Sequence, residues 1–350
     1  MKRFSISLAS FILAILLVAP MSMFAGNKQR AGSAGATQLL INPWARSSGF
    51  GNANAASIRG LESQYLNVAG TAFVTGTELI FVHTNWLAGA DIGINAFGFS
   101  QKVSETGVLS LSVMSIDLGK IPITTVALPE GGIGTFHPVF TNIGLSYAKA
   151  FSNSIFGGMT LRIVNEGITD VKASGVAIDA GIHYVTGKNQ QIKFGIALKN
   201  VGPTMKYSGD GLTVRADLPS ELNMTVEQRS AEFELPSLMN ISVSYDFIFN
   251  ENNILQMAGT FTSNSFTKDQ ICLGSEYNFR NLILARVGYV YEEGVFDYET
   301  RETAFTGPTC GLSVQIPMNK EKGSVFAVEY SYRDTNPFNG VHSIQARVTL

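Results

Sequence analysis

The chain has 350 residues, of which 15% are charged, and its net charge at pH 7 is −2. Soluble proteins average roughly 25% charged residues, and nucleic-acid-binding domains carry a basic footprint, so the composition argues against both classes. After the first 25 residues, no apolar run approaches the ~20 residues that a transmembrane helix needs.

The first residues have the order of a secretory signal peptide. Lys2 and Arg3 precede an apolar stretch over residues 11–18, and small residues follow at Ala25 and Gly26. This stretch is too short for a membrane anchor, and no cysteine near the expected cleavage site supports a lipid anchor. Residues 1–25 are therefore predicted to be a signal peptide.

Residues 26–76 do not have the pattern of a strand. They are rich in small residues, include Arg46, Arg59 and Glu62, and lack sustained alternation. A large closed barrel has room for a segment of this kind in its lumen. We expect a plug inside the barrel that the following residues predict, or a periplasmic segment.

From residue 77 onward, apolar and polar residues alternate in many segments. In residues 176–184, Val176 and Ile182 share one face, and Asp179 and His183 share the other. A period of two is typical of a β-strand whose faces meet different surroundings. The same alternation over residues 91–96 predicts a lipid face made of Ile92, Ile94 and Ala96. Asp91 and Asn95 lie on the opposite face.

Fourteen segments fit this interpretation, and several reach the ~9 to 11 residues that cross a bilayer at a tilt. A soluble sandwich also alternates, but its strands average ~5 or 6 residues, and an even strand number is typical of bacterial barrels. The predicted fold class is all-β, with residues 77–350 forming a transmembrane antiparallel β-barrel. The predicted strands are 77–86, 89–103, 107–118, 139–150, 155–166, 174–186, 191–200, 238–249, 252–262, 269–279, 282–292, 304–317, 324–333 and 341–350.

Short and long connections alternate along the barrel segment. The longer ones are predicted at 119–138, 167–173, 201–237, 293–303 and 334–340. Outer-membrane barrels have short periplasmic turns and longer outer loops. The pattern predicts the outer membrane of a Gram-negative bacterium, with lipid as a partner and both termini in the periplasm.

Charged residues within the strands keep to the predicted lumen face. Their signs are mixed, so they do not form the single-sign ring of an ion-selective pore. They are expected to pair across the lumen and with the plug, and the alternative is a lined path for a polar solute. The predicted lumenal charges are Asp91, Arg162, Asp179, Glu276, Arg286, Glu329 and Arg347.

No catalytic, cofactor or metal site is predicted. The four histidines lie on separate segments, and Cys272 and Cys310 have opposite parity, which disfavours a disulfide. The run "PEGGIG" at 129–134 lacks the lysine and the strand–loop–helix context of a phosphate loop. The chain is predicted not to be an enzyme and not to bind nucleic acid.

The N-terminal segment resembles the PorV/PorQ family of outer-membrane proteins, which are related to FadL-type fatty-acid channels. The run "ARSSGFGNANAAS" followed by "YLNVAG" is similar to the family pattern "AR…GMGGA…YWNPAG", with Phe50 and Val68 in place of its methionine and proline. Looser similarity covers nearly all of the mature chain, including "LPSLMNISVSYDF" and "EYSYRDTNPFNGVH". The matching residues are Ala45, Arg46, Gly49, Gly51, Tyr65, Asn67, Ala69 and Gly70.

The resemblance implies a FadL-like barrel that acts in type IX protein secretion of Bacteroidetes-like bacteria. Its implied partners are the translocon barrel and the C-terminal domains of secreted cargo. Exposed apolar residues of the long loops are candidate contacts, although the loops could instead pack on each other as a cap. The candidates are Ile121, Leu128, Phe136, Leu212, Leu222 and Phe233. The alternative function is a FadL-like passive channel for hydrophobic small molecules.

The chain ends in the alternating run "SIQARVTL". Ile344, Ala346, Val348 and Leu350 lie on one face, and Arg347 lies on the other. An unpaired strand edge is not tolerated in lipid, so this last strand is predicted to pair with the first and close the barrel. Its apolar face is expected to point toward lipid.

Overall fold

The computed structural model describes residues 30, 32–217, 223–319 and 323–350. The predicted signal peptide, residues 1–25, lies outside the described residues, as does Leu222 of the candidate loop contacts. No helix in the described part of the chain is long and apolar enough to cross a membrane.

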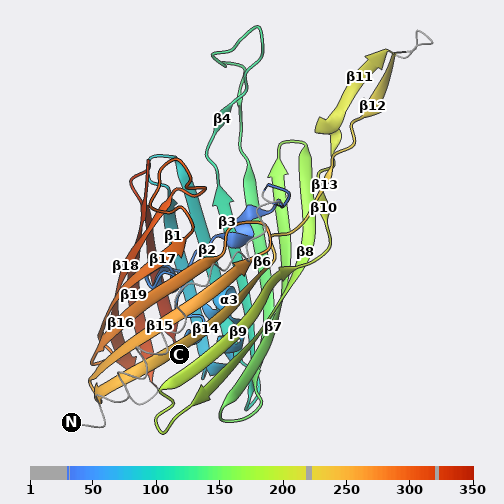
Figure 1. The fold of residues 1–350 in the computed structure, drawn as a ribbon. Coiled ribbons are helices and arrows are strands. Elements are labelled where there is room, and N and C mark those ends of the chain that lie inside the picture. The colour runs from blue at the N-terminus through green and yellow to red at the C-terminus, as the bar shows by residue number, and fades with distance from the viewer. Residues whose placement is uncertain (1–29, 31, 218–222, 320–322) are drawn as a thin grey trace.

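Fourteen antiparallel strands form a closed barrel, as the sequence predicted (Figure 1). The first and last strands close it, with Phe81 opposite Ala346 and with Thr77 and Leu350 exchanging backbone hydrogen bonds. The barrel strands are β1 (Thr77–Trp86), β2 (Ile92–Lys102), β3 (Gly107–Asp117), β6 (Val139–Ala150), β7 (Ile155–Ile168), β8 (Val171–Thr186), β9 (Ile192–Val201), β14 (Leu238–Asn250), β15 (Asn253–Asn264), β16 (Gln270–Phe279), β17 (Ile283–Glu292), β18 (Phe305–Asn319), β19 (Ser324–Thr335) and β20 (Val341–Thr349).

Most strands turn their apolar residues outward. Ile182 is 58% exposed on the outer surface, whereas the next residue, His183, is 1% exposed and faces the lumen. The assignment for residues 92–96 was wrong: Ile94 and Ala96 are buried in the lumen, and Asn95 faces outward. The reason is that the lumen beside β2 is filled by apolar side chains, so both faces of this strand meet apolar surroundings.

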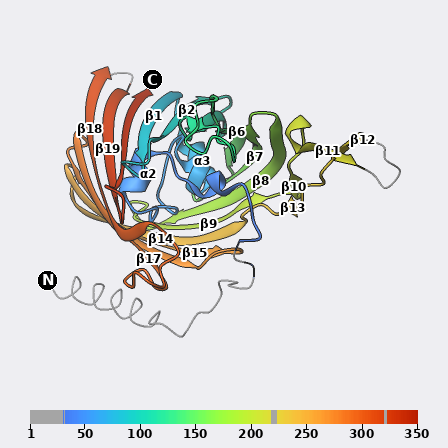
Figure 2. The same cartoon turned by 90° about the horizontal axis from the view of Figure 1, so that it is seen from above.

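Residues 32–76, hereafter the plug, lie inside the ring of strands, where Figure 2 shows α2 and α3. The plug is almost entirely buried from Gln38 to Gly70. Its short helices leave many backbone groups to be satisfied by turns and by the barrel wall. They are the 3₁₀ helices η2 (Thr37–Leu40) and η3 (Val68–Phe73) and the α-helices α2 (Ala45–Gly49) and α3 (Ser63–Leu66).

Glycines in the wall allow the plug backbone to approach closely. A Cβ atom added at Gly288 would lie 2.5 Å from the backbone C and O atoms of Phe50, and one added at Gly274 would lie 2.5 Å from the ring of Phe50. Phe50 itself is fully buried beside Cys272 and Val290. Here the lumen face of β16 and β17 is shaped to accept the plug.

The connections differ at the two ends of the barrel. The turn end, where β20 ends and β1 begins, has short turns, and the loop end carries two long connections, 118–138 and 202–237. Within them, β4 (Ile121–Pro122) pairs with β5 (Thr135–Phe136), β10 (Met205–Lys206) with β13 (Glu232–Phe233), and β11 (Thr213–Asp217) with β12 (Asn223–Glu227). Figure 1 shows the first and last of these hairpins projecting beyond the barrel.

The predicted loop at 167–173 is instead a two-residue turn, because β7 and β8 continue past the other strands. The long connection 202–237 supports this extension: the backbones of Lys172 and Ser208 exchange two hydrogen bonds of 2.9 Å. Tyr207 also donates a hydrogen bond to Glu166. Pairing with a distant loop therefore lengthened both strands beyond what local alternation indicated.

Candidate functional site

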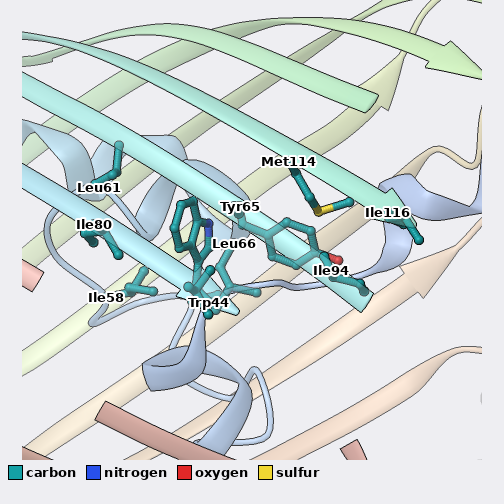
Figure 3. Close-up of a cluster of buried hydrophobic side chains, with 12 residues drawn as sticks. Trp44, Ile58, Leu61, Tyr65, Leu66, Ile80, Ile94, Met114 and Ile116 are labelled. Atoms are coloured by element: carbon teal, nitrogen blue, oxygen red, sulfur yellow. The ribbon is translucent and has the colours of Figure 1, made fainter. Parts of the chain in front are cut away.

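An apolar strip covers the lumen side of β1, β2 and β3. Residues of these strands pack against the plug side chains Trp44, Ile58, Leu61, Tyr65 and Leu66, as Figure 3 shows. The strand residues in this cluster are Ile80, Val82, Ile94, Ala96, Met114 and Ile116. At the loop end, the strip is continued by the partly buried side chains of Trp86, Ile92, Leu118 and Phe140.

A pocket lies where this strip meets the plug and the walls of β3, β6 and β7. Its cavity volume is about 20 Å³, which is little more than a water molecule needs. Its apolar lining residues are Leu39, Ile41, Pro43, Trp44, Tyr65 and Met114. Its polar lining residues are Gln38, Gln64, Ser112, Asn142 and Arg162. The pocket is thus amphipathic, with the polar side on η2, α3 and the wall.

Two amide side chains in this pocket have buried atoms without hydrogen-bond partners. Gln38 is 2% exposed, and neither its Nε2 nor its Oε1 has a partner; Asn142 is 4% exposed, and its Oδ1 has none. The amide of Gln64, in contrast, donates to the backbone oxygen of Gly144 and to Ser146 Oγ. Unpaired buried amides are costly, so the protein alone leaves polar atoms of Gln38 and Asn142 unsatisfied beside this pocket.

Arg162, the one charged residue among the described lining residues, is neutralised by Asp179. Its Nη2 and Nε lie 2.5 and 3.2 Å from Asp179 Oδ2, and both side chains are buried. A buried guanidinium that is paired in this way is already satisfied by charge. The pocket therefore offers neutral hydrogen-bonding groups rather than a free positive charge.

A second polar cluster joins the plug to the closing seam of the barrel. Gln345 of β20 donates to Glu62 Oε1 at 2.7 Å and to Glu329 Oε2 at 2.5 Å, and it accepts from the backbone N–H of Ala45 at 2.9 Å. Glu78 of β1 accepts from the backbone N–H of Leu61 at 2.8 Å. The plug is thus bonded to both strands that form the seam.

Charge in the seam cluster is close to balance. Arg347 lies 3.2 Å from Glu329 and 3.9 Å from Glu78. Burial, followed by repulsion from Glu329, raises the pKa of the plug residue Glu62 to about 7. Burial alone would lower the pKa of Arg46. The attraction of its guanidinium to carboxylates, chiefly those of Glu62 and Glu329, is larger, so the pKa of Arg46 is raised.

The predicted lumenal charges are therefore paired, with one exception. Arg162 pairs with Asp179, and Arg347 pairs with Glu329. Arg286 forms a third pair with Glu276 and also donates to Ser313 Oγ at 2.7 Å. Asp91 does not face the lumen: it lies in the exposed connection between β1 and β2, with φ of 57°. The assignment of Asp91 was wrong because β2 begins at Ile92 and has the opposite orientation.

The residues that carry the family resemblance build the plug. Ala45 and Gly49 bound α2, which contains Arg46, and Gly51 follows with φ of 69°. Asn67 caps η3 by accepting from the backbone N–H of Ala69, and it donates to the backbone of Ile182 in the wall at 3.0 Å. Gly70 lies so close to the backbone oxygen of Ile58 that a Cβ atom would clash. Tyr65 lies on α3 and lines the pocket, with Lys199 Nζ 3.7 Å from its ring centre.

The described candidate loop contacts fall into three groups. Ile121 and Leu128 are 37% and 51% exposed on the first projecting hairpin. Phe136 and Leu212 are half-buried. Phe233 packs on Tyr207, with ring centres 5.5 Å apart, beside the buried cluster of Leu39 and Met205. The base of connection 202–237 therefore packs on the plug and on the wall of β7 and β8, and among the described candidates Ile121 and Leu128 of the first projecting hairpin are the exposed ones.

The described residues contain no group of three or more His, Cys, Asp or Glu side chains placed to hold a metal ion. Cys272 is buried and Cys310 is exposed, and both are free thiols. Sequence reasoning missed Gln38, Asn142 and Gln345 as site residues. Gln345 and Asn142 each had a signal, because alternation in "SIQARVTL" and in "NIGLSY" places them on the lumen face, whereas Gln38 had none.

Comparison with solved structures identifies the same fold in hydrocarbon channels. The toluene transporter TodX of Pseudomonas putida superposes with a TM-score of 0.57 at 11% identity, covering 88% of this chain and 97% of TodX. The toluene transporter TbuX of Ralstonia pickettii gives 0.53 at 12% identity, covering 88% and 97%. A FadL homologue of Pseudomonas aeruginosa gives 0.54 at 12% identity, covering 87% and 98%.

No protein-family model and no curated protein sequence matches the chain. At these identities the structural likeness is one of fold. The chain therefore has the FadL-like fold of outer-membrane barrels, and membership of the PorV/PorQ family stays a prediction.

Proposed function

We propose that the protein is a passive outer-membrane channel for hydrophobic small molecules. The observation that carries this proposal is the continuous apolar strip on the lumen side of β1–β3, which runs from the loop end to the pocket. An apolar lumen surface is unusual in water-filled barrels, whose interior is polar. The fold that the chain shares with two toluene transporters supports the same proposal.

The strip gives a physical route for such a solute. Trp86, Leu118 and Phe140 form its outer part at the loop end, and Trp44 and Tyr65 form its inner part beside the pocket. A hydrophobic molecule that moves along these side chains stays out of water, and each buried CH₂ group contributes ~0.8 kcal/mol. Because the plug packs on the strip, passage requires local displacement of plug side chains.

Photo-crosslinking in outer membranes tests the route. A diazirine-bearing alkylbenzene is activated in membranes that contain the protein, and labelled peptides are identified by mass spectrometry. Labels are expected on the lumen-facing residues Ile92, Met114 and Phe140, in addition to outward residues that meet lipid. Labels confined to outward residues such as Leu111 and Leu145 would contradict the proposal.

A second candidate function is docking of a partner protein in type IX secretion. The observation that favours it is the pair of projecting hairpins (Figure 1), which carry solvent-exposed apolar residues. They include Val126, Leu128, Ile133, Val214 and Met224, each at least 40% exposed. The partners would be the translocon barrel and the C-terminal domains of secreted cargo.

Truncation of one hairpin tests this second function without disturbing the lumen. Deletion of 211–228 leaves the β10–β13 pair, whose base packs against the plug, in place. If the hairpin docks a partner, surface delivery of secreted proteins falls while the barrel still assembles. Unchanged delivery with a normally assembled barrel would contradict docking through this hairpin.

A further inference from the structure

The apolar strip on the lumen side of β1, β2 and β3 ends at a leucine of the plug. We propose that the side chain of Leu61, seated against Gly98 of β2, is the seal that closes this strip toward the turn end of the barrel. The inference rests on the proposed channel function and names the residue that limits passage. Leu61 is fully buried, and the sequence gave it no role.

The strand register shows where the strip changes from apolar to polar. Lumen-facing residues of β1, β2 and β3 lie opposite one another in successive levels, two residues apart along each strand. From the loop end to the turn end, these levels are Thr84 with Ile94 and Ile116, Val82 with Ala96 and Met114, Ile80 with Gly98 and Ser112, and Glu78 with Ser100 and Ser110. The first two levels are mainly apolar, whereas the last is polar and buried. The level of Gly98 is therefore the boundary.

Leu61 fills the notch that Gly98 leaves in the wall. A Cβ atom added at Gly98 would lie 2.1 Å from Cδ2 of Leu61 and 3.0 Å from its Cγ. Figure 3 shows Leu61 and Ile80 at one end of the cluster, with Ile94 and Ile116 at the other. The side chain of Leu61 therefore stands between the apolar strip and the polar level that follows it.

On both sides of this contact, the plug is joined to the wall by hydrogen bonds. The backbone N–H of Leu61 donates to Glu78 of β1 at 2.8 Å. Gln64 donates to Ser146 Oγ of β6 at 3.0 Å and to the backbone oxygen of Gly144 at 3.2 Å. Between these points, at Gly98, the described contact is the apolar side chain of Leu61. Separating an apolar contact leaves no polar group unpaired, so a hydrophobic solute passes here at the least cost.

The backbone on both sides of Leu61 is fixed. Gly60 donates a backbone hydrogen bond of 3.1 Å to Gly70, and the carboxylate of Glu62 accepts from Gln345 at 2.7 Å. The side chain of Leu61, in contrast, is held by packing. Passage therefore requires displacement of this side chain rather than of the plug segment as a whole.

Truncation of the seal tests the proposal. Leu61→Ala leaves a gap at the end of the strip, because the surrounding structure relaxes only partly around a shortened side chain. The full-length protein is expressed in a strain that lacks hydrocarbon channels, and initial rates of labelled toluene uptake are compared at matched amounts of heat-modifiable barrel. Leu61→Ala is expected to take up toluene several-fold faster than wild type. An unchanged or lower rate would overturn the proposal.

Two further variants separate the seal from a general loosening of the plug. Val68 is also a buried plug residue at a wall glycine, since its Cγ2 would lie 3.2 Å from a Cβ atom added at Gly158 of β7. Val68→Ala lies outside the strip and is expected to keep the wild-type rate. Leu61→Ala combined with Gly98→Val returns to the wall about the volume that the plug loses, so it is expected to restore the wild-type rate. An equal increase for Val68→Ala, or no reduction in the double variant, would overturn the proposal.

The same rates separate the seal from the channel function on which it rests. If wild type exceeds empty vector and Leu61→Ala does not exceed wild type, the channel function stands and the seal is overturned. If wild type equals empty vector and Leu61→Ala exceeds both, the seal stands and the channel function of the wild type is overturned. If neither protein exceeds empty vector, both are overturned.

Discussion

The side-chain amide of Gln345, in the last strand, donates a hydrogen bond of 2.7 Å to Glu62, in the middle of the plug. Gln345 lies between Val82 of β1 and Glu329 of β19 in the register of the seam. The plug therefore binds the barrel at the position where the two ends of the sheet meet. We infer that this contact stabilises barrel closure as well as the position of the plug.

Gln345→Leu is expected to destabilise the folded barrel by roughly 1–3 kcal/mol, because it leaves Glu62, Glu329 and the backbone N–H of Ala45 short of a partner. The free energy of unfolding is measured by urea titration in lipid vesicles. Gln315→Leu, at a half-exposed position of β18, is the control and should change it little. Equal effects of the two variants would refute the role of the seam contact.

The stability of the protein is expected to fall as the pH rises from about 4.5 through about 7. The pKa of Glu62 in the folded chain, about 7, lies above its ordinary value of 4.5, so the folded state binds more protons between these values. The contribution of Glu62 to the free energy of unfolding is therefore fully present below pH 4.5 and is lost as the carboxyl ionises near pH 7.

Urea titrations of wild type and Glu62→Gln at several pH values check this dependence. The variant mimics the protonated carboxyl, so it should gain stability relative to wild type above pH 7 and lose most of that advantage near pH 5. A difference between the two proteins that does not change with pH would contradict the assigned titration.

Gly288→Ala is expected to destabilise the barrel by about 1–3 kcal/mol, the usual cost of overpacking. The added methyl group would meet the backbone of Phe50 and Gly51, which cannot move without shifting the plug. Gly259→Ala is the matched control, because its methyl group would meet the end of the Leu273 side chain at 3.3 Å and the backbone oxygen of Cys272 at an ordinary contact distance of 3.8 Å. Thermal unfolding of both variants gives the comparison, and similar melting temperatures would argue against a tightly docked plug.

Arginine substitutions on the outer face of β20 test its contact with lipid. Ile344, which is 60% exposed, lies nearer the middle of the strand than Val348. Ile344→Arg should cost roughly 2–4 kcal/mol, whereas Val348→Arg near the turn end should cost about 0–1 kcal/mol. The yield of heat-modifiable barrel in the outer membrane reports the difference, and a greater loss for Val348→Arg would contradict this placement.

Alternation predicted the barrel well. Charged residues such as Asp179 and Arg286 cannot face lipid, so their positions show which residues of each strand face the lumen. Alternation failed where the lumen is also apolar. Ile94 and Ala96 meet the plug, and the lipid face of β2 carries Phe97 and Phe99 instead. No property of strand β2 alone distinguishes these two apolar surroundings.

The candidate site was less accessible to sequence reasoning than the barrel. The parity of Gln345 is readable, but its partner Glu62 is 283 residues away and lies in a segment without regular pattern. Gln38 is one of several polar residues in the plug, and its unpaired amide depends on how η2 meets β6 and β7. Such contacts arise from packing between distant segments, which a local pattern does not encode.

Uptake of a hydrophobic solute by cells tests the central proposal most directly. A strain that lacks hydrocarbon channels is complemented with wild type, Phe140→Asn or Thr141→Asn, and the initial rate of labelled toluene uptake is measured at matched barrel levels. Phe140 belongs to the lumenal apolar strip, and Thr141 is the next residue on the outer face. We predict faster uptake with wild type and Thr141→Asn than with empty vector, and a several-fold loss with Phe140→Asn. Equal uptake with wild type and empty vector would contradict the channel function.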